Sequence, residues 1–386
     1  MRRTCVPIGV MTACAAILTG LLGNASYGAA YVFSNVADSS GALNFNPGSS
    51  RPSINSTGTA AFVAGVDAGG TGIFTGNGGG VTTVLTSQGS PFASFNRPQI
   101  SSTGAIAFVG FPDAAGSGVY IRSGGTTTTV SDFSGPMASY FSDVGINSSG
   151  TVVFGGEQDN SDRGIFTGNG GSVATAANTT GQFDAFGSSP SINTSGAVAF
   201  RASRDTSGSG VYRATAGGTL TPIATTDGGT FAGFNEAPSI NDSNRVAFVG
   251  TEGVYTGDGG ALTTVVTLSG TSFSGFSAVN INNVGGVAFL ASLDNGQAGL
   301  FTGSDPVNNK IVTTGEDLFG SPLVDLRVGP KFLNDAGQTA FYFQLEDGRN
   351  GVAIASLIPE PGSLALLVSA GAGLTLSRRR RRPGLA

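Results

Sequence analysis

The sequence predicts an all-β protein made of seven similar four-stranded sheets, and three observations lead to this prediction. The 386-residue chain contains 63 glycines and 16 prolines, between which valine, isoleucine and phenylalanine recur at short intervals. Such a composition is typical of many short strands joined by tight turns. A nine-residue motif recurs seven times, and the two ends of the array of repeats complement each other as parts of one sheet.

The motif is represented by "INTSGAVAF", residues 192–200, and its relatives are "INSTGTAAF", "ISSTGAIAF", "INSSGTVVF", "INDSNRVAF", "INNVGGVAF" and "LNDAGQTAF". We call its second, polar position the lead residue. The seven lead residues are Asn55, Ser101, Asn147, Asn193, Asn241, Asn282 and Asn334. They are separated by 46, 46, 46, 48, 41 and 52 residues, which is the pattern of a tandem repeat.

Each copy of the repeat predicts four strands. In the first copy these are residues 51–55, 59–65, 71–76 and 81–87, and the turns between them are rich in glycine, asparagine and aspartate. These residues close tight turns because they tolerate positive φ or bond their own backbone. Four strands in about 46 residues is the size of a β-propeller blade, so we predict a seven-bladed propeller over residues 31–358. The alternatives are an open stack of sheets and a β-solenoid.

The ends of the array predict how the ring closes. The seventh copy contains "KFLND", "QTAFYFQ" and "GVAIASL", which are three strands without a fourth. The segment "YVFSNVA", residues 31–37, is a strand without a partner just before the first copy. We therefore expect it to form the outer strand of the seventh blade, so that the ring has no spare edge available for aggregation.

The first 30 residues have the layout of a secretory signal peptide. Arg2 and Arg3 precede an apolar run over residues 6–22, and small residues then allow cleavage after Gly28 or Ala30, of which we favour Ala30. Both cysteines of the chain fall inside this segment. Signal peptidase and the export machinery are thus expected partners, and the exported body can form neither disulfides nor thiolate metal sites.

The last 28 residues, 359–386, have three parts. A Pro359–Glu360–Pro361 triplet is followed by an apolar stretch, residues 362–377, and then by the arginines Arg378, Arg379, Arg380, Arg381 and Arg382. Sixteen helical residues span about 24 Å, which is less than the roughly 30 Å hydrocarbon core. The arginines would hold the C-terminus in the cytoplasm. The segment predicts transient insertion into the inner membrane, with a permanent anchor as the alternative.

This tail resembles a PEP-CTERM sorting domain, with the triplet, the short apolar helix and the basic stop in the order of that family. The resemblance implies recognition and cleavage by an exosortase, in a bacterium that makes exopolysaccharide. The repeat resembles the tandem repeats of the NxxGxxxAF type in exported bacterial proteins. It departs from that pattern at Ser101, Asn244 and Val153.

Charge and composition exclude several classes of function. Of 19 basic residues, Arg2, Arg3 and the five terminal arginines lie in the end segments, as does Glu360 among 24 acidic residues. The body therefore carries 12 basic and 23 acidic residues, a net of about −11, which argues against nucleic acid as a partner. Because the chain has no histidine, a Ser-His-Asp triad and a histidine-ligated zinc are also excluded.

An acidic residue follows the motif in every copy, between strands two and three. These acids are Asp67, Asp113, Asp159, Asp205, Glu252, Asp294 and Glu346. In a propeller they would form a ring on one face, which would suit Ca²⁺ or a cationic ligand. The alternative is that they start hairpin turns by bonding their own backbone. No other cofactor is expected.

Two further repeated features have open interpretations. The lead residues are predicted to cap their turns, or else to form a polar ring near the central channel on the opposite face. Phenylalanine pairs between strands four and one are predicted to pack between blades, or else to stack on sugars. These pairs are Phe92 and Phe95, Phe183 and Phe186, Phe231 and Phe234, and Phe273 and Phe276.

Together these features predict an exported, monomeric protein of the cell surface or extracellular matrix. It would bind or organise exopolysaccharide or other surface partners without enzymatic activity, because the acids are spread evenly and form no single asymmetric cluster. The alternatives are a propeller glycoside hydrolase or polysaccharide lyase, and a calcium-stabilised structural module.

Overall fold

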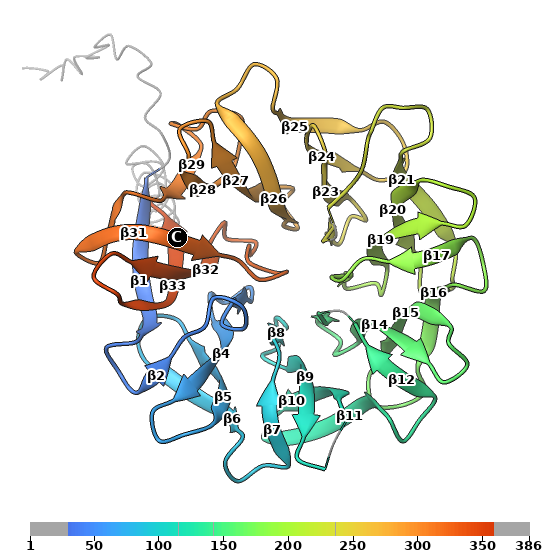
Figure 1. The fold of residues 1–386 in the computed structure, drawn as a ribbon, viewed down its shortest axis with the longest axis horizontal. Coiled ribbons are helices and arrows are strands. Elements are labelled where there is room, and N and C mark those ends of the chain that lie inside the picture. Colours follow the sequence, from blue (N-terminus) through green and yellow to red (C-terminus); the bar gives the residue numbers. More distant parts are fainter. Residues whose placement is uncertain (1–29, 115, 142, 236, 359–386) are drawn as a thin grey trace, which may run out of the picture.

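The computed structural model describes residues 30–114, 116–141, 143–235 and 237–358. Their regular structure is entirely β-strand, arranged as seven sheets around a central opening (Figure 1). The predicted seven-bladed propeller is therefore confirmed. The predicted signal peptide, the sorting triplet, the apolar helix over residues 362–377 and the arginine run lie outside the described residues. Within those residues, no helix is long and apolar enough to cross a membrane.

The blades follow one another along the chain, and their strands are as follows. Blade 1 contains β2 (Leu43–Asn44), β3 (Ser53–Ile54), β4 (Ala60–Val66), β5 (Thr71–Gly76) and β6 (Val81–Thr86). Blade 2 contains β7 (Phe92–Phe95), β8 (Gln99–Ile100), β9 (Ile106–Pro112), β10 (Gly118–Ser123) and β11 (Thr126–Asp132). Blade 3 contains β12 (Met137–Tyr140), β13 (Gly145–Ile146), β14 (Val152–Gln158), β15 (Arg163–Gly168) and β16 (Ala174–Asn178). Blade 4 contains β17 (Phe183–Phe186), β18 (Ser191–Ile192), β19 (Val198–Arg204), β20 (Ser209–Ala214) and β21 (Leu220–Thr225).

The remaining blades complete the ring. Blade 5 contains β22 (Ser239–Ile240), β23 (Val246–Gly250), β24 (Gly253–Gly257) and β25 (Thr263–Thr267). Blade 6 contains β26 (Phe273–Ile281), β27 (Val287–Leu293), β28 (Ala298–Phe301) and β29 (Lys310–Thr313). Blade 7 contains β30 (Asp317–Leu318), β31 (Ser321–Arg327), β32 (Thr339–Leu345), β33 (Asn350–Leu357) and β1 (Tyr31–Asp38).

The innermost strand of a blade is longer than predicted and is usually interrupted. In blade 2, β7 and β8 both pair with β9, so Phe92 and Phe95 belong to a strand and not to a connection. Proline precedes the short inner piece in four copies, at Pro52, Pro98, Pro190 and Pro238. Proline has no N–H to donate to the ladder and so interrupts the strand. Blade 6 has Val279 at this position and keeps one continuous strand, β26, whereas blade 3 is interrupted without a proline.

The N-terminal strand closes the ring, as predicted. Strand β1 pairs antiparallel with β33, with Tyr31 opposite Leu357 and Phe33 opposite Ala355. Beyond the strand ends, the N–H of Ile358 donates to the carbonyl of Ala30 at 2.8 Å. The two ends of the described chain therefore meet at the outer edge of blade 7.

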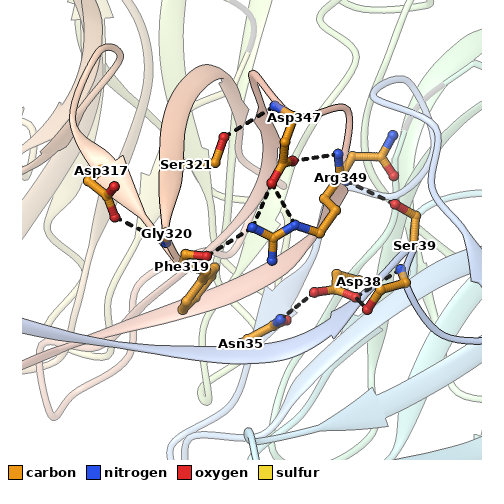
Figure 2. Close-up of polar contacts among 11 residues, drawn as sticks. Asn35, Asp38, Ser39, Asp317, Phe319, Gly320, Ser321, Asp347 and Arg349 are labelled. Carbon is orange, nitrogen blue, oxygen red and sulfur yellow. Dashed lines mark hydrogen bonds and ion pairs between the residues drawn. The ribbon is translucent and has the colours of Figure 1, made fainter.

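Polar contacts fix the other end of this closing strand (Figure 2). Arg349 donates from Nη2 to the carbonyl of Phe319 at 2.9 Å and pairs through Nε with Asp347 at 2.8 Å. Next to it, the N–H of Asn350 donates to Ser39 Oγ at 3.1 Å, and the N–H of Ser39 donates to the carbonyl of Asn350 at 2.8 Å. The turn of blade 7 and the end of β1 are thus held in one hydrogen-bonded unit.

The core lies between blades. The phenylalanine that ends each copy of the motif is almost completely buried: Phe62, Phe108, Phe154, Phe200, Phe248, Phe289 and Phe341. One cluster joins Phe62 of blade 1 to Tyr342 of blade 7, while Ala61 and Val63, on the opposite side of the same strand, pack with Phe108 of blade 2. Both sides of strand two are therefore buried, which explains why its sequence does not alternate.

Candidate functional site

The lead residues join neighbouring blades as well as closing their own turns. In Asn193, Oδ1 accepts hydrogen bonds from the N–H of Ala197 at 2.9 Å and from Ser195 Oγ at 2.8 Å. The amide Nδ2 of the same side chain donates to the carbonyl of Asn241 in the next blade at 3.0 Å. The same Nδ2 also donates to Asn244 Oδ1 at 3.0 Å, so both acceptors of this amide, which is only 3 % exposed, lie in the next blade. The lead residue therefore caps its own turn and belongs to a polar ring at the same time, so the two interpretations do not exclude each other.

The same amide bond is found at five seams of the ring. Its donors and acceptors are Asn147 to Asn193 at 3.1 Å, Asn193 to Asn241 at 3.0 Å, Asn241 to Asn282 at 3.2 Å, Asn282 to Asn334 at 3.0 Å, and Asn334 to Asn55 at 2.9 Å. The sequence reasoning missed this role because the acceptor belongs to another copy of the repeat.

Blade 2 interrupts this chain of amide bonds. Its lead residue is Ser101, whose Oγ accepts from the N–H of Ala105 at 3.1 Å but has no amide to donate to blade 3. In the described part of the chain, Asn55 makes no amide bond to blade 2 either. Both seams of blade 2 therefore lack the connection that the other five seams possess.

A groove opens at each of these two seams. The first, between blades 1 and 2, has a volume of about 610 Å³ and is lined mainly by threonines and glycines together with Arg122. We call it the threonine groove. The second, between blades 2 and 3, has a volume of about 200 Å³. We call it the seam groove, and its lining residues are Asn96, Arg97, Val109, Phe111, Ser117, Tyr140, Phe141, Asp143 and Ser188.

The seam groove contains an ion pair. Arg97 Nη1 lies 3.1 Å from Asp143 Oδ2, and the Asp143 side chain is only 6 % exposed. Ser189 Oγ also donates to Asp143 Oδ2 at 3.2 Å. Burial raises the pKa of Asp143, although the charge of Arg97 and the hydroxyl of Ser189 act in the opposite direction. The carboxylate therefore depends on Arg97 for its charged state.

Aromatic side chains surround the seam groove. Phe111 and Phe133 are 39 % and 44 % exposed, and no other aromatic side chain in the described ranges is an exposed large hydrophobic residue. Phe133 is stacked on Tyr140 with ring centroids 5.7 Å apart, and Arg163 lies 5.1 Å from the centroid of Phe141. Burial raises the pKa of Tyr140 to about 12, so its hydroxyl stays protonated in its bond to Ser131.

The phenylalanine pairs singled out from the sequence pack inside the molecule. Phe92 and Phe95 are 4 % and 5 % exposed, and both rings lie edge-on to Phe108 with centroids less than 6 Å apart. Similar clusters occur around Phe183, Phe231 and Phe273. These pairs stabilise the blades, and the exposed aromatic surface comes from Phe111 and Phe133 instead.

The seven acidic residues between strands two and three are all exposed. In six blades the N–H of the acid donates to a carbonyl just before or at the start of the innermost strand, for example from Asp113 to Pro91 at 3.0 Å. Glu252 differs because its turn is shorter, and Thr251 makes that bond. Among the residues that the structure describes, no group of three or more acidic side chains is close enough to hold a metal ion.

The central channel forms a third cavity of about 270 Å³ on the side of the lead residues. Lys331, Asp242 and Asp335 contribute charged side chains to its wall. Lys331 is partly accessible from the channel, but the surrounding protein lowers the pKa of its ammonium group by burial, against the attraction of Asp335 and Asp242. This cavity has no aromatic lining.

Fold and grooves together define a seven-bladed propeller whose symmetry is broken at blade 2. A family model described as a family of unknown function, DUF7453, matches residues 85–329, so the chain belongs to that family. A search of curated protein sequences finds no match.

Solved structures with a similar fold include enzymes. An oligogalacturonate lyase in complex with manganese is 12 % identical with a TM-score of 0.52, over 86 % of this chain and 99 % of the lyase. An oligogalacturonate lyase from Vibrio parahaemolyticus is 11 % identical with a TM-score of 0.50, over 86 % and 99 %. A prolyl endopeptidase is 12 % identical with a TM-score of 0.52, over 87 % of this chain and 51 % of the peptidase. This chain thus spans about half the length of the peptidase, and these likenesses concern the fold alone.

Proposed function

We propose that this protein is an exported, non-enzymatic protein of the cell surface or extracellular matrix that binds saccharide in the seam groove. The observation that carries the proposal is the position of Phe111 and Phe133, the two exposed aromatic side chains among the described residues, beside a groove lined by Asn96, Arg97 and Ser188. Exposed rings next to a few convergent polar groups are the usual composition of a carbohydrate-binding surface.

Export and sorting complete the proposal. Signal peptidase removes residues 1–30, the tail over residues 359–386 passes transiently through the inner membrane, and an exosortase cleaves near Pro359–Glu360–Pro361. The hydrogen bond between Ile358 and Ala30 at the edge of blade 7 supports this scheme, because the described residues that border the two processing sites are side by side.

The second candidate is a polysaccharide lyase or glycoside hydrolase, which the likeness to oligogalacturonate lyases favours. Glycoside hydrolases commonly use a pair of carboxyl groups on opposite sides of the bond that they cleave. Asp143 is the one carboxylate among the residues lining the seam groove, and it is engaged by Arg97. Binding without turnover is therefore the better-supported candidate.

Co-sedimentation of the full-length protein with the exopolysaccharide of the producing organism tests the proposal. We expect saturable binding, unchanged by a calcium chelator, and no new reducing ends or unsaturated products after long incubation. The double variant Phe111→Ala with Phe133→Ala should weaken binding at least tenfold. The control, Val84→Ala, also shortens an apolar side chain but lies in the threonine groove, and it should leave binding unchanged. Release of products would favour the enzyme, and absence of binding would contradict the saccharide-binding function.

A further inference from the structure

Three arginines lie close together on consecutive blades of an acidic protein. Arg327 belongs to β31 of blade 7, Arg51 lies before β3 of blade 1, and Arg97 occupies the equivalent position in blade 2. Burial and the positive charges of Arg97 and Arg327 lower the pKa of Arg51. Arg51 forms no ion pair with the described residues, and its Nε donates to the carbonyl of Pro47 at 3.1 Å. Arg97 and Arg327 are each paired with a carboxylate, Arg97 with Asp143 and Arg327 Nε with Asp325 Oδ2 at 3.0 Å, so the charge of Arg51 is the one in this row that no ion pair neutralises.

Arg97 connects this basic row to the seam groove. Its Nη1 is bound to Asp143, but its Nε is buried and has no hydrogen-bond partner. A buried donor without a partner is uncommon in folded proteins and calls for an acceptor such as an ordered water or a bound group. Arg201 Nε and Arg204 Nε also lack a partner, but of the three arginines only Arg97 lines the seam groove. The side chain is 25 % exposed and lines the groove, so a ligand in the groove can reach the guanidinium group.

We infer that the seam groove binds a carboxylate-bearing sugar, a uronate, with its carboxylate on Arg97 and its ring against Phe111. The inference rests on the saccharide-binding function proposed above and adds the chemical class of the sugar. A planar guanidinium group matches the two oxygens of a carboxylate. The volume of about 200 Å³ is below the roughly 300–1,000 Å³ of pockets for drug-sized ligands, so the groove accepts one sugar unit of a chain.

The arrangement of charge suits an anionic chain rather than an isolated sugar. From the groove, neighbouring uronate units would extend towards Arg51 and Arg327, while the rest of the body, with its net negative charge, would repel the chain. Binding is therefore expected to weaken with increasing salt, because exposed charges are screened over about 10 Å at 0.1 M.

Calorimetric titration of the full-length protein with oligogalacturonate, and with its methyl ester as a neutral analogue with the same ring, tests the inference. We expect at least tenfold tighter binding of the free acid. The double variant Arg97→Gln with Asp143→Asn removes both charges, so no unpaired charge stays buried. It should lose most of the preference for the free acid and keep only the part that Arg51 and Arg327 supply. Arg122→Gln in the threonine groove is the matched control and should behave as wild type.

The outcomes separate the inference from the function on which it rests. Equal binding of acid and ester by the wild type, or an undiminished preference in the double variant, overturns the inference and leaves saccharide binding intact. A sulfated glucan that binds as tightly as the free acid would show selection for charge alone and also overturns it. Absence of binding to acid, ester and neutral glucan alike contradicts the saccharide-binding function itself. Melting curves of each variant establish that the fold is retained.

Discussion

At the scale of single residues, one lead position differs from the other six. Ser101 replaces the asparagine whose amide joins the blades at the other lead positions, and the two grooves open at its two seams. The departure is visible in the sequence, but its meaning is not, because the missing bond would end on a carbonyl in another copy. The sequence likewise does not show that Arg97, Phe111 and Asp143 line one groove, because they come from two different copies of the repeat.

Ser101→Asn is expected to restore an amide bond between blades 2 and 3. One hydrogen bond contributes about 0.5–1.5 kcal/mol, so the free energy of unfolding should rise by that amount. Tightening this seam should also weaken saccharide binding in the seam groove. Urea denaturation and co-sedimentation measure the two effects.

The reciprocal change, Asn193→Ser, serves as the control at a seam away from the seam groove. It removes the donor to Asn241 at a buried position and should lower the free energy of unfolding by about 1–3 kcal/mol without affecting saccharide binding. Equal stability of both variants and the wild type would refute the structural role of the lead amides.

The raised pKa of Asp143 predicts how stability depends on pH. Because burial raises this pKa above its ordinary value of 3.8, the native state binds the proton more readily than the unfolded state. The contribution of Asp143 to stability is then complete below about pH 3.8 and is lost as the pH rises through the folded-state pKa. The free energy of unfolding of the wild type, relative to Asp143→Asn, should therefore fall across that window.

Chemical denaturation of both proteins at pH values on each side of the window measures this difference. A difference that is independent of pH would show that the carboxyl group titrates alike in the folded and unfolded states. Arg97→Gln should raise the pKa of Asp143 further, since the guanidinium charge lowers it, and carbon NMR of the carboxyl group reports that shift.

At the scale of elements, strands two to four of each blade could be predicted from the sequence, whereas the innermost strand could not be described fully. Strands two to four are bounded by glycine, asparagine and aspartate turns within one copy. The innermost strand is interrupted at Pro98 and its equivalents, so its outer half, such as β7, reads as a connection. The signal for Phe111 was an aromatic residue at a position that is Gly65 in the first copy and Glu157 in the third.

The turns that carry the seven acids are expected to be stable without metal. Their backbone bonds, such as that from Asp159 to Pro136 at 3.0 Å, hold the turns through the main chain. Addition of a chelator should therefore leave the melting temperature unchanged, as should Asp113→Asn with Asp159→Asn. A fall in melting temperature on chelation would instead support the calcium-stabilised module, since a ligand of the native state stabilises it by mass action.

Strand β1 is expected to be essential for a soluble monomer. Deletion of residues 31–38 would expose the edge of β33, which otherwise pairs with β1 from Tyr31 to Asp38. An unpaired edge associates with other strands, so the deleted protein should form oligomers in light-scattering measurements and melt at a lower temperature. Deletion of residues 1–29 is the control and should leave both properties unchanged.

At the scale of the whole molecule, the proximity of Ala30 and Ile358 predicts that the position of the ends can be moved. A circular permutant that joins Ile358 to Ala30 by a short linker and opens between Gly124 and Gly125, in an exposed hairpin turn, should form the same ring. Its melting temperature should lie within a few degrees of the wild type. A permutant that fails to fold would show that the free ends at blade 7 are required during folding.

Because the first strand of the propeller pairs with the last, the ring can close only when the whole body is present. In the export proposed above, strand β1 would be the first to emerge, yet its partner β33 ends at Leu357, so the first strand would stay unpaired until almost the whole of the body has followed. A chain that stops early keeps an unpaired strand and an open ring, and it therefore remains recognisable to the proteases outside the membrane. Resistance to digestion should thus arise abruptly with the last strand rather than gradually with each blade.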